Sequence, residues 1–121
     1  GNLAPRRDFT YVTDTADGFV RAATAEGVAG EAINLGSGKS VSIAELLQTI
    51  LRMIGKPVKV TGDPARVRPA KSEVDNLVAD NRKAAALLGW RPRTGMEEGL
   101  GRTIEWVARH PGLFKPECYA V

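Results

Sequence analysis

Residues 30–55 read GEAINLGSGKSVSIAELLQTILRMIG, and the glycine turn in the middle looks at first like a phosphate-binding loop. A P-loop needs a glycine five residues before its Gly-Lys-Ser, and that position holds Ile33. A dinucleotide-binding GxGxxG motif that starts at Gly36 would place its third glycine at Val41. No acidic residue follows at the spacing that a ribose contact would need. Neither phosphate-binding motif is therefore complete.

The same stretch predicts a strand, a glycine turn, a capped helix and a second strand. Residues 32–35 are a short apolar run between glycines, which is typical of a buried strand. Ser42 begins a Ser-x-x-Glu capping box with Glu45, which opens a helix that Gly55 ends. Residues 58–61 are predicted to be the second strand. One face of the helix is expected to be buried: Ile43, Leu46, Leu47, Ile50, Leu51 and Ile54.

Two more helices and one more strand are predicted on either side of this stretch. Residues 9–12 are expected to form a strand, and residues 80–88 a helix that Asp80 caps and Gly89 ends. Residues 14–25 are expected to form a helix with one apolar face. That face consists of Ala16, Phe19, Val20 and Ala23.

A last helix is predicted to begin at a second capping box, made by Thr94 and Glu97, and to end at His110. Its apolar face carries Met96, Leu100, Ile104 and Val107. Together the elements predict an α/β fold, or α+β if the chain is considered by itself, with a few short strands and four helices.

Composition predicts one ordinary domain over residues 1–121. The chain is 43% hydrophobic, and it has neither an apolar run long enough to span a membrane nor the pattern of a signal peptide. Its single cysteine, Cys118, cannot form an internal disulfide, so a cytoplasmic location is expected. The net charge of +3 suggests an anionic partner without choosing among nucleic acid, phosphorylated metabolites and none.

Candidate catalytic and metal-binding residues are scarce. His110 is the only histidine, and its place before a proline at a helix end favours a capping or solvent role over catalysis. Cys118 has no histidine arranged around it in the sequence. Tyr11 is followed four residues later by Thr15, so the Tyr-x-x-x-Lys proton-transfer pair is absent. We therefore predict no catalytic residue and no metal ligand in this chain.

Three stretches together resemble the C-terminal part of extended short-chain dehydrogenase/reductases. They are RRDFTYVTDTADGFVRAA, GEAINLGSGKSVSIAELL and RPAKSEVDNLVADNRKAAALLGWRPRTGMEEGLGRTIEW. The members in question are NAD(P)-dependent nucleotide-sugar epimerases and 4,6-dehydratases, and the resemblance covers nearly the whole chain. It implies that the glycine turn links a sheet strand to a helix, so that Gly36 and Gly38 serve backbone conformation rather than phosphate binding.

The resemblance also shows what this chain lacks. In that family the NAD(P) fingerprint and Tyr-x-x-x-Lys lie in the first two thirds of a chain of about three hundred residues. We therefore expect a substrate-binding portion that holds no NAD(P) by itself and is inactive alone. The sequence leaves open the base, the sugar and the choice among epimerisation, dehydration and reduction.

By resemblance, three residues bind the nucleotide diphosphate sugar. Arg7 and Arg68 match arginines that hold the pyrophosphate, and Glu73 matches the acid that accepts ribose hydroxyls. Guanidinium forks suit paired phosphate oxygens better than ammonium groups do. Related enzymes place the acid three residues after the arginine, whereas Glu73 follows Arg68 by five, so Lys71 or Asp75 could share this role.

Structural roles are the alternative for the same residues. Arg7 could pair with Asp8 or Asp14, and the loop over residues 62–78 could be merely solvated. The sequence also allows two other functions: a non-enzymatic module that pairs with itself or a partner, and a nucleic-acid binder.

The sequence has neither a helix-turn-helix signal nor a basic run interleaved with aromatics, so we expect no nucleic-acid partner. In a whole enzyme of this family, the strand over residues 32–35, or both this strand and that over residues 9–12, would lie against a larger sheet. We therefore expect an uncovered sheet edge and apolar face in this chain. This predicts a homodimer, with an interface over residues 43–54 or the neighbouring strands.

Overall fold

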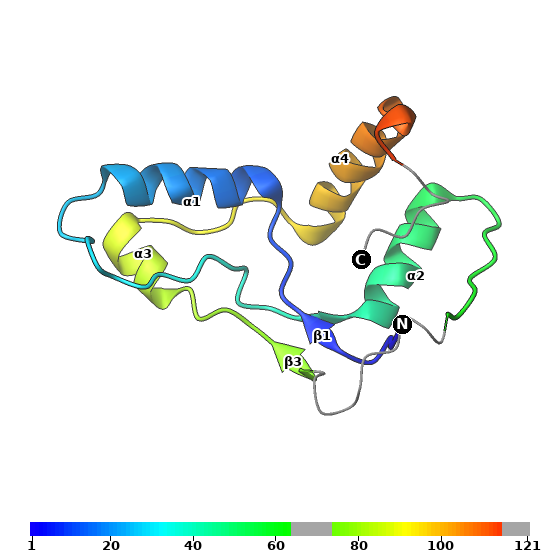
Figure 1. The fold of residues 1–121 in the computed structure, drawn as a ribbon, viewed down its shortest axis with the longest axis horizontal. Coiled ribbons are helices and arrows are strands. Elements are labelled where there is room, and N and C mark those ends of the chain that lie inside the picture. The colour runs from blue at the N-terminus through cyan, green and yellow to red at the C-terminus, as the bar shows by residue number, and fades with distance from the viewer. Residues whose placement is uncertain (64–73, 115–121) are drawn as a thin grey trace.

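The computed structural model describes residues 1–63 and 74–114. In these parts the chain forms four α-helices, a small sheet and a short 3-10 helix (Figure 1). In chain order the elements are β1 (Arg6–Arg7), α1 (Val12–Thr24), β2 (Val41–Ser42), α2 (Ile43–Ile54), β3 (Asn76–Leu77), α3 (Arg82–Leu88), α4 (Met96–Arg109) and the 3-10 helix Pro111–Leu113. The predicted α/β class with four helices and a few short strands is confirmed.

The sheet joins three segments that are far apart in the sequence. Its strand order is β2-β1-β3, with β1 antiparallel to β2 and parallel to β3. Arg7, in the middle strand, is therefore in register with Val41 on one side and Leu77 on the other. As Figure 1 shows, the sheet lies between two helix pairs, with α1 near α3 at one end and α2 near α4 at the other.

Helix α2 begins and ends as its sequence predicts. The hydroxyl of Ser42 accepts a hydrogen bond from the Glu45 backbone, and the Glu45 carboxylate accepts one from the Ser42 backbone. Gly55 ends the helix in the left-handed conformation, with φ of 65°. The predicted apolar face is half-buried, except for the exposed Ile54, because α2 packs on α4 and β2.

Helix α1 forms where it is predicted, but its buried face is the opposite one. The four residues of the expected apolar face are all exposed, including Phe19 at 67% and Val20 at 63%. The face that packs instead carries Asp14 and Gly18, both buried. A Cβ atom on Gly18 would lie 2.5 Å from Leu35, so the missing side chain lets α1 approach residues 33–35 closely.

The buried core lies between α1 and α3. Its buried members within the described residues are Ala84, Leu88 and Trp90, and Trp90 is only 1% exposed. The indole Nε1 of Trp90 donates to the backbone oxygen of Asp14 over 2.9 Å, which ties the chain after α3 to α1. Gly89 ends α3 with φ of 59°, as predicted.

Two predicted helix caps are wrong. Helix α4 begins at Met96 with Gly95 as its N-cap, and the Thr94–Glu97 capping box is not formed. The backbone N–H groups of Arg93 and Thr94 donate to the Asp14 carboxylate instead, which fixes how the chain enters α4. Similarly, Asn81 rather than Asp80 is the N-cap of α3, and the Asp80 carboxylate binds Arg82.

Three predicted strands are not formed. Residues 9–12 lead into α1, because the pairing with β2 and β3 falls earlier, on Arg6–Arg7. Residues 32–35 and 58–61 form no strand with any described part of the chain. For residues 32–35 the reason is the lack of a neighbour: their backbone groups make no hydrogen bond within the described residues. No helix in the described ranges is long and apolar enough to cross a membrane.

Candidate functional site

The glycine turn is organised by a carboxylate of the chain itself. Asp8 Oδ1 accepts hydrogen bonds from the backbone N–H of Ser37 at 2.9 Å and from its hydroxyl at 2.5 Å. Asp8 Oδ2 accepts from the N–H groups of Gly38 at 2.9 Å and Ala79 at 3.2 Å. The donors that would face a phosphate in a P-loop therefore face Asp8. The turn therefore shapes the backbone as expected, but the strand expected before it, at residues 32–35, is not formed within the described residues.

The surroundings of Asp8 affect both its titration and the neighbouring glycines. Partial burial raises the pKa of the carboxyl, but the hydrogen bonds from Ser37, Gly38 and Ala79 outweigh it and leave the pKa below the ordinary 3.8. A Cβ on Gly36 would lie 2.3 Å from Ala79 and 2.8 Å from Asp8 Oδ2, so only glycine fits. Gly38 has φ of 74°, which glycine tolerates best.

Arg7 lies beside this turn, on the middle strand. Its Nη1 donates to the backbone oxygens of Arg6 at 2.8 Å and Val74 at 2.6 Å. These two bonds fix the guanidinium between β1 and the residues that lead into β3. The carboxylates of Asp8 and Asp14, the alternative partners considered for Arg7, accept the hydrogen bonds of the turn and of residues 93–94.

Most of the other predicted binding residues fall in the part of the chain that the structure does not describe. Arg68, Glu73 and the alternative Lys71 lie outside the described residues, as does Cys118. Asp75, the second alternative, is exposed next to β3, and its backbone oxygen accepts from Arg6 N at 2.7 Å. His110 is the C-cap of α4, with its ring stacked on Trp106 at 4.6 Å.

A cavity of about 420 Å³ opens beside Arg7. Three cationic side chains line it: Arg7 from β1, Lys39 from the end of the glycine turn, and Arg93 from the loop before α4. The remaining lining residues are Phe9, Ser37, Val41, Pro92, Thr94, Gly95 and Met96. The positive charge and the volume suit a small anionic ligand. Sequence reasoning missed Lys39 and Arg93, because only the fold brings them beside Arg7.

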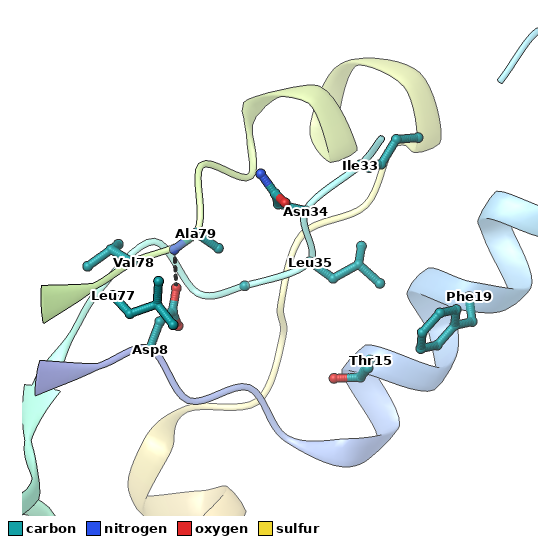
Figure 2. Close-up of a pocket in the computed structure, with 10 residues that line it drawn as sticks. Asp8, Thr15, Phe19, Ile33, Asn34, Leu35, Leu77, Val78 and Ala79 are labelled. Carbon is teal, nitrogen blue, oxygen red and sulfur yellow. Dashed lines mark hydrogen bonds between the residues drawn. The ribbon is translucent and has the colours of Figure 1, made fainter. Parts of the chain in front are cut away.

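A second hollow, of about 610 Å³, lies on the other side of Asp8 and is mostly apolar. Figure 2 shows Phe19 and Thr15 of α1, Ile33 and Leu35 of the extended segment, and residues 77–79 around it. The dashed line in Figure 2 is the hydrogen bond from Ala79 to Asp8, which closes one end. Apolar side chains, together with the unpaired backbone of residues 32–35, give this face the character of a packing surface.

Comparisons with known proteins identify the family of the chain. The family model described as GDP-mannose 4,6 dehydratase matches residues 1–103. A UDP-glucuronate 4-epimerase from Thermodesulfobacterium geofontis is 37% identical over 116 residues, covering 95% of this chain and 34% of the relative. The chain is thus of the short-chain dehydrogenase/reductase type, as the sequence predicted. The chain belongs to the GDP-mannose 4,6-dehydratase family.

Solved structures place the same fold within larger enzymes. An epimerase from Methanothermobacter thermautotrophicus superposes with a TM-score of 0.82 at 31% identity, covering 93% of this chain and 33% of the other. The protein MoeE5, solved with UDP-glucuronic acid and NAD, gives a TM-score of 0.77 at 31% identity over 90% and 35% of the two chains. This chain therefore spans about a third of the length of the proteins it matches.

Proposed function

We propose that this chain supplies the nucleotide-diphosphate-sugar contacts of an NAD(P)-dependent nucleotide-sugar 4,6-dehydratase or epimerase. The observation that carries the proposal is the position of Arg7. Its guanidinium is held on the middle strand by two backbone carbonyls and lines a cationic cavity. A guanidinium fixed in this way meets a diphosphate at low entropic cost. Arg68 and Glu73 would complete the site, with Arg68 on the diphosphate and Glu73 on the ribose.

The residues present do not fit a dinucleotide cofactor. In a dinucleotide site the glycine turn offers its N–H groups to the pyrophosphate. Here the N–H groups of Ser37 and Gly38 already bind a carboxylate, and the Asp8 charge would repel a phosphate. NAD(P) would be held by the part of the enzyme that the longer relatives possess. This chain alone is therefore proposed to bind no NAD(P) and to turn over no nucleotide sugar.

Titrations with nucleotides and NAD test this proposal. The 121-residue chain is titrated with UDP, GDP and dTDP by NMR, and with NAD by calorimetry. We expect nucleoside diphosphates to bind weakly, on the order of millimolar, because the chain spans only about a third of the length of its relatives. Salt and the variants Arg7→Ala and Arg68→Ala should each weaken binding. Shifts that neither variant changes would refute the site, and micromolar binding of NAD would refute the assignment of the cofactor elsewhere.

A non-enzymatic, self-associating or partner-binding module derived from the same family is the second candidate. It is favoured by the exposed apolar face of α1 and by residues 32–35, whose backbone is unpaired within the described residues. Either feature is suited to pairing with another protein surface. We propose that the chain by itself forms a homodimer, with this face in the interface alongside or in place of the residues 43–54 expected from the sequence.

A further inference from the structure

The ion pairs of the described residues show an uneven distribution of positive charge. Most cationic side chains have an acidic partner within 4 Å: Arg6 with Glu45, Arg21 with Asp17, Arg52 with Glu97, Arg82 with Asp80, Lys83 with Glu31, Arg102 with Glu98 and Arg109 with Glu105. Within the described ranges, Lys39 and Arg93 have no such partner, and both line the cavity beside Arg7. Lys56, Lys59 and Arg91 also lack an acidic partner within these ranges, but they do not line the cavity, which therefore brings two unpaired cations together beside Arg7.

The backbone around both residues is held in place by buried or half-buried carboxylates. Lys39 follows the turn that Asp8 organises, and its own N–H donates to the Ser37 hydroxyl at 3.2 Å. Arg93 N donates to the Asp14 carboxylate at 3.0 Å, and Asp14 itself is only 7% exposed. Both side chains are exposed, but their points of attachment to the backbone are fixed on either side of the cavity.

Lys39 and Arg93, on the same cavity, repel each other unless an anion lies between them. Such an arrangement does not improve the stability of the chain, so its use is to be sought in a ligand. The volume of about 420 Å³ lies in the range of small-molecule sites and is too small for a folded partner. The hydroxyl of Thr94, which makes no cap for α4, adds a neutral donor to the lining.

We propose that Lys39 and Arg93 are two further diphosphate-binding residues of this chain, acting with Arg7 on the phosphoryl oxygens of one ligand. This inference rests on the proposed nucleotide-sugar site, and it assigns contacts beyond the Arg7, Arg68 and Glu73 set. The ammonium of Lys39 contributes a point charge, whereas the guanidinium of Arg93 presents a planar fork to paired oxygens. The three residues come from three separate segments, so binding also ties the glycine turn to the start of α4.

The test uses inorganic pyrophosphate and UDP as probes of the ¹⁵N-labelled 121-residue chain. We expect the amide shifts of Lys39, Gly95 and Met96 to move with both probes. Lys39→Ala and Arg93→Ala should each raise the dissociation constant about two- to fivefold, as for exposed charge contacts. Arg91→Ala is the matched control, since Arg91 is also an unpaired, exposed arginine but does not line the cavity. Lys39→Gln and Arg93→Gln repeat the test with a polar side chain that is longer than alanine but carries no charge.

The outcomes separate this inference from the proposed function. If Arg7→Ala weakens UDP binding while the Lys39 and Arg93 variants bind like the parent chain, the inference is overturned and the nucleotide site stands. Equal losses in Arg91→Ala would show a diffuse charge effect and would also overturn it. A short DNA duplex that competes for the same shifts as tightly as UDP would point to a nucleic-acid surface, contrary to both proposals.

Discussion

Helices α1 and α2 both carry an apolar stripe, yet only the stripe of α2 finds a partner within the described chain. The stripe of α2 lies half-buried against α4 and β2. The stripe of α1 is open, with Val12, Phe19 and Val20 more than 60% exposed, while its other face packs on Leu35 and on the core at Trp90. An amphipathic pattern therefore predicts that a face will be buried, but not that its partner belongs to the same chain.

The two halves of the molecule therefore differ in how they bury their apolar stripes. The stripe of α2 packs on α4, whereas the stripe of α1 is exposed. Burying a Phe or Val side chain contributes about 1.5–3 kcal/mol, which the open face of α1 forgoes. Ile33 and Leu35 line the same hollow as Phe19, and residues 32–35 leave their backbone groups unpaired within the described residues. Since the chain spans about a third of its relatives, we propose that the rest of such an enzyme covers this side.

The largest expected effect comes from removing the Trp90 side chain, which holds α1 against the chain after α3. Trp90→Ala removes the largest fully buried side chain and its hydrogen bond to Asp14, so the free energy of unfolding should fall by about 3–5 kcal/mol. The core has few other buried members, and we expect α1 and α3 to separate. Urea unfolding followed by circular dichroism measures the loss. Trp106→Ala is the control, because Trp106 is 50% exposed and should change little. Equal losses in both variants would contradict this account of the core.

A smaller effect is expected at the turn between the two halves. Asp8→Asn keeps the shape but removes the charge that accepts four hydrogen bonds, and should cost about 2–3 kcal/mol. Because the folded-state pKa of Asp8 lies below the ordinary 3.8, the carboxylate stabilises the fold above about pH 4. That stabilisation is lost as the pH falls through the folded-state pKa.

Unfolding measured between pH 7 and pH 2.5 tests the sign of this dependence. The difference in stability between the parent chain and Asp8→Asn should be constant near neutrality and shrink in acid. Other carboxylates with lowered pKa values, such as Asp80 at about 2, titrate in both proteins and cancel in the difference. Asp17→Asn serves as control, since its exposed pair with Arg21 is worth only a few tenths of a kcal/mol. A difference that grows in acid would refute the role of Asp8.

Local sequence signals predicted the helices well and the tertiary pairing poorly. The Ser42–Glu45 box and the terminal glycines at positions 55 and 89 depend on neighbouring residues only, and all were confirmed. The strand over residues 9–12 was wrong, since pairing partners select Arg6–Arg7. The Thr94 box failed because the buried Asp14 carboxylate takes the Arg93 and Thr94 N–H groups, a contact nearly eighty positions distant in the sequence.

Only those residues of the candidate site that belong to a stretch shared with the family could be predicted from the sequence. Arg7 was identified by resemblance, and the structure places it on a cationic cavity. Its proposed role on a diphosphate, like those of Arg68 and Glu73, stays a prediction. Lys39 and Arg93 were missed because each is an ordinary surface cation in the sequence, and only the fold reveals that neither has an acidic partner within the described ranges. Asp8 was considered only as a partner of Arg7, because its contacts with residues 37, 38 and 79 depend on the fold.

The smallest effect on folding is expected on the open face of α1, where the consequence should appear in assembly instead. Phe19→Ser exchanges a 67% exposed side chain for a polar one, so the free energy of unfolding of the monomer should change by less than about 0.5 kcal/mol. If two copies cover this face, the same variant should shift the dimer towards monomer. The effect should exceed that of Trp106→Ser, which removes an exposed aromatic from α4 rather than from α1.

Sedimentation at several concentrations, with binding of a hydrophobic dye, separates the outcomes. A parent chain that dimerises and a Phe19→Ser variant that does not would assign the α1 face to the interface. A dimer that persists in Phe19→Ser but dissociates in Leu47→Ser would assign the interface to α2, as the sequence predicts. A parent chain that stays monomeric at high micromolar concentration and binds no dye would refute self-association altogether. In that case the apolar stripe of α1 would remain exposed to water in the monomer. The two helices would then differ in exposure, but this difference would have no effect on assembly.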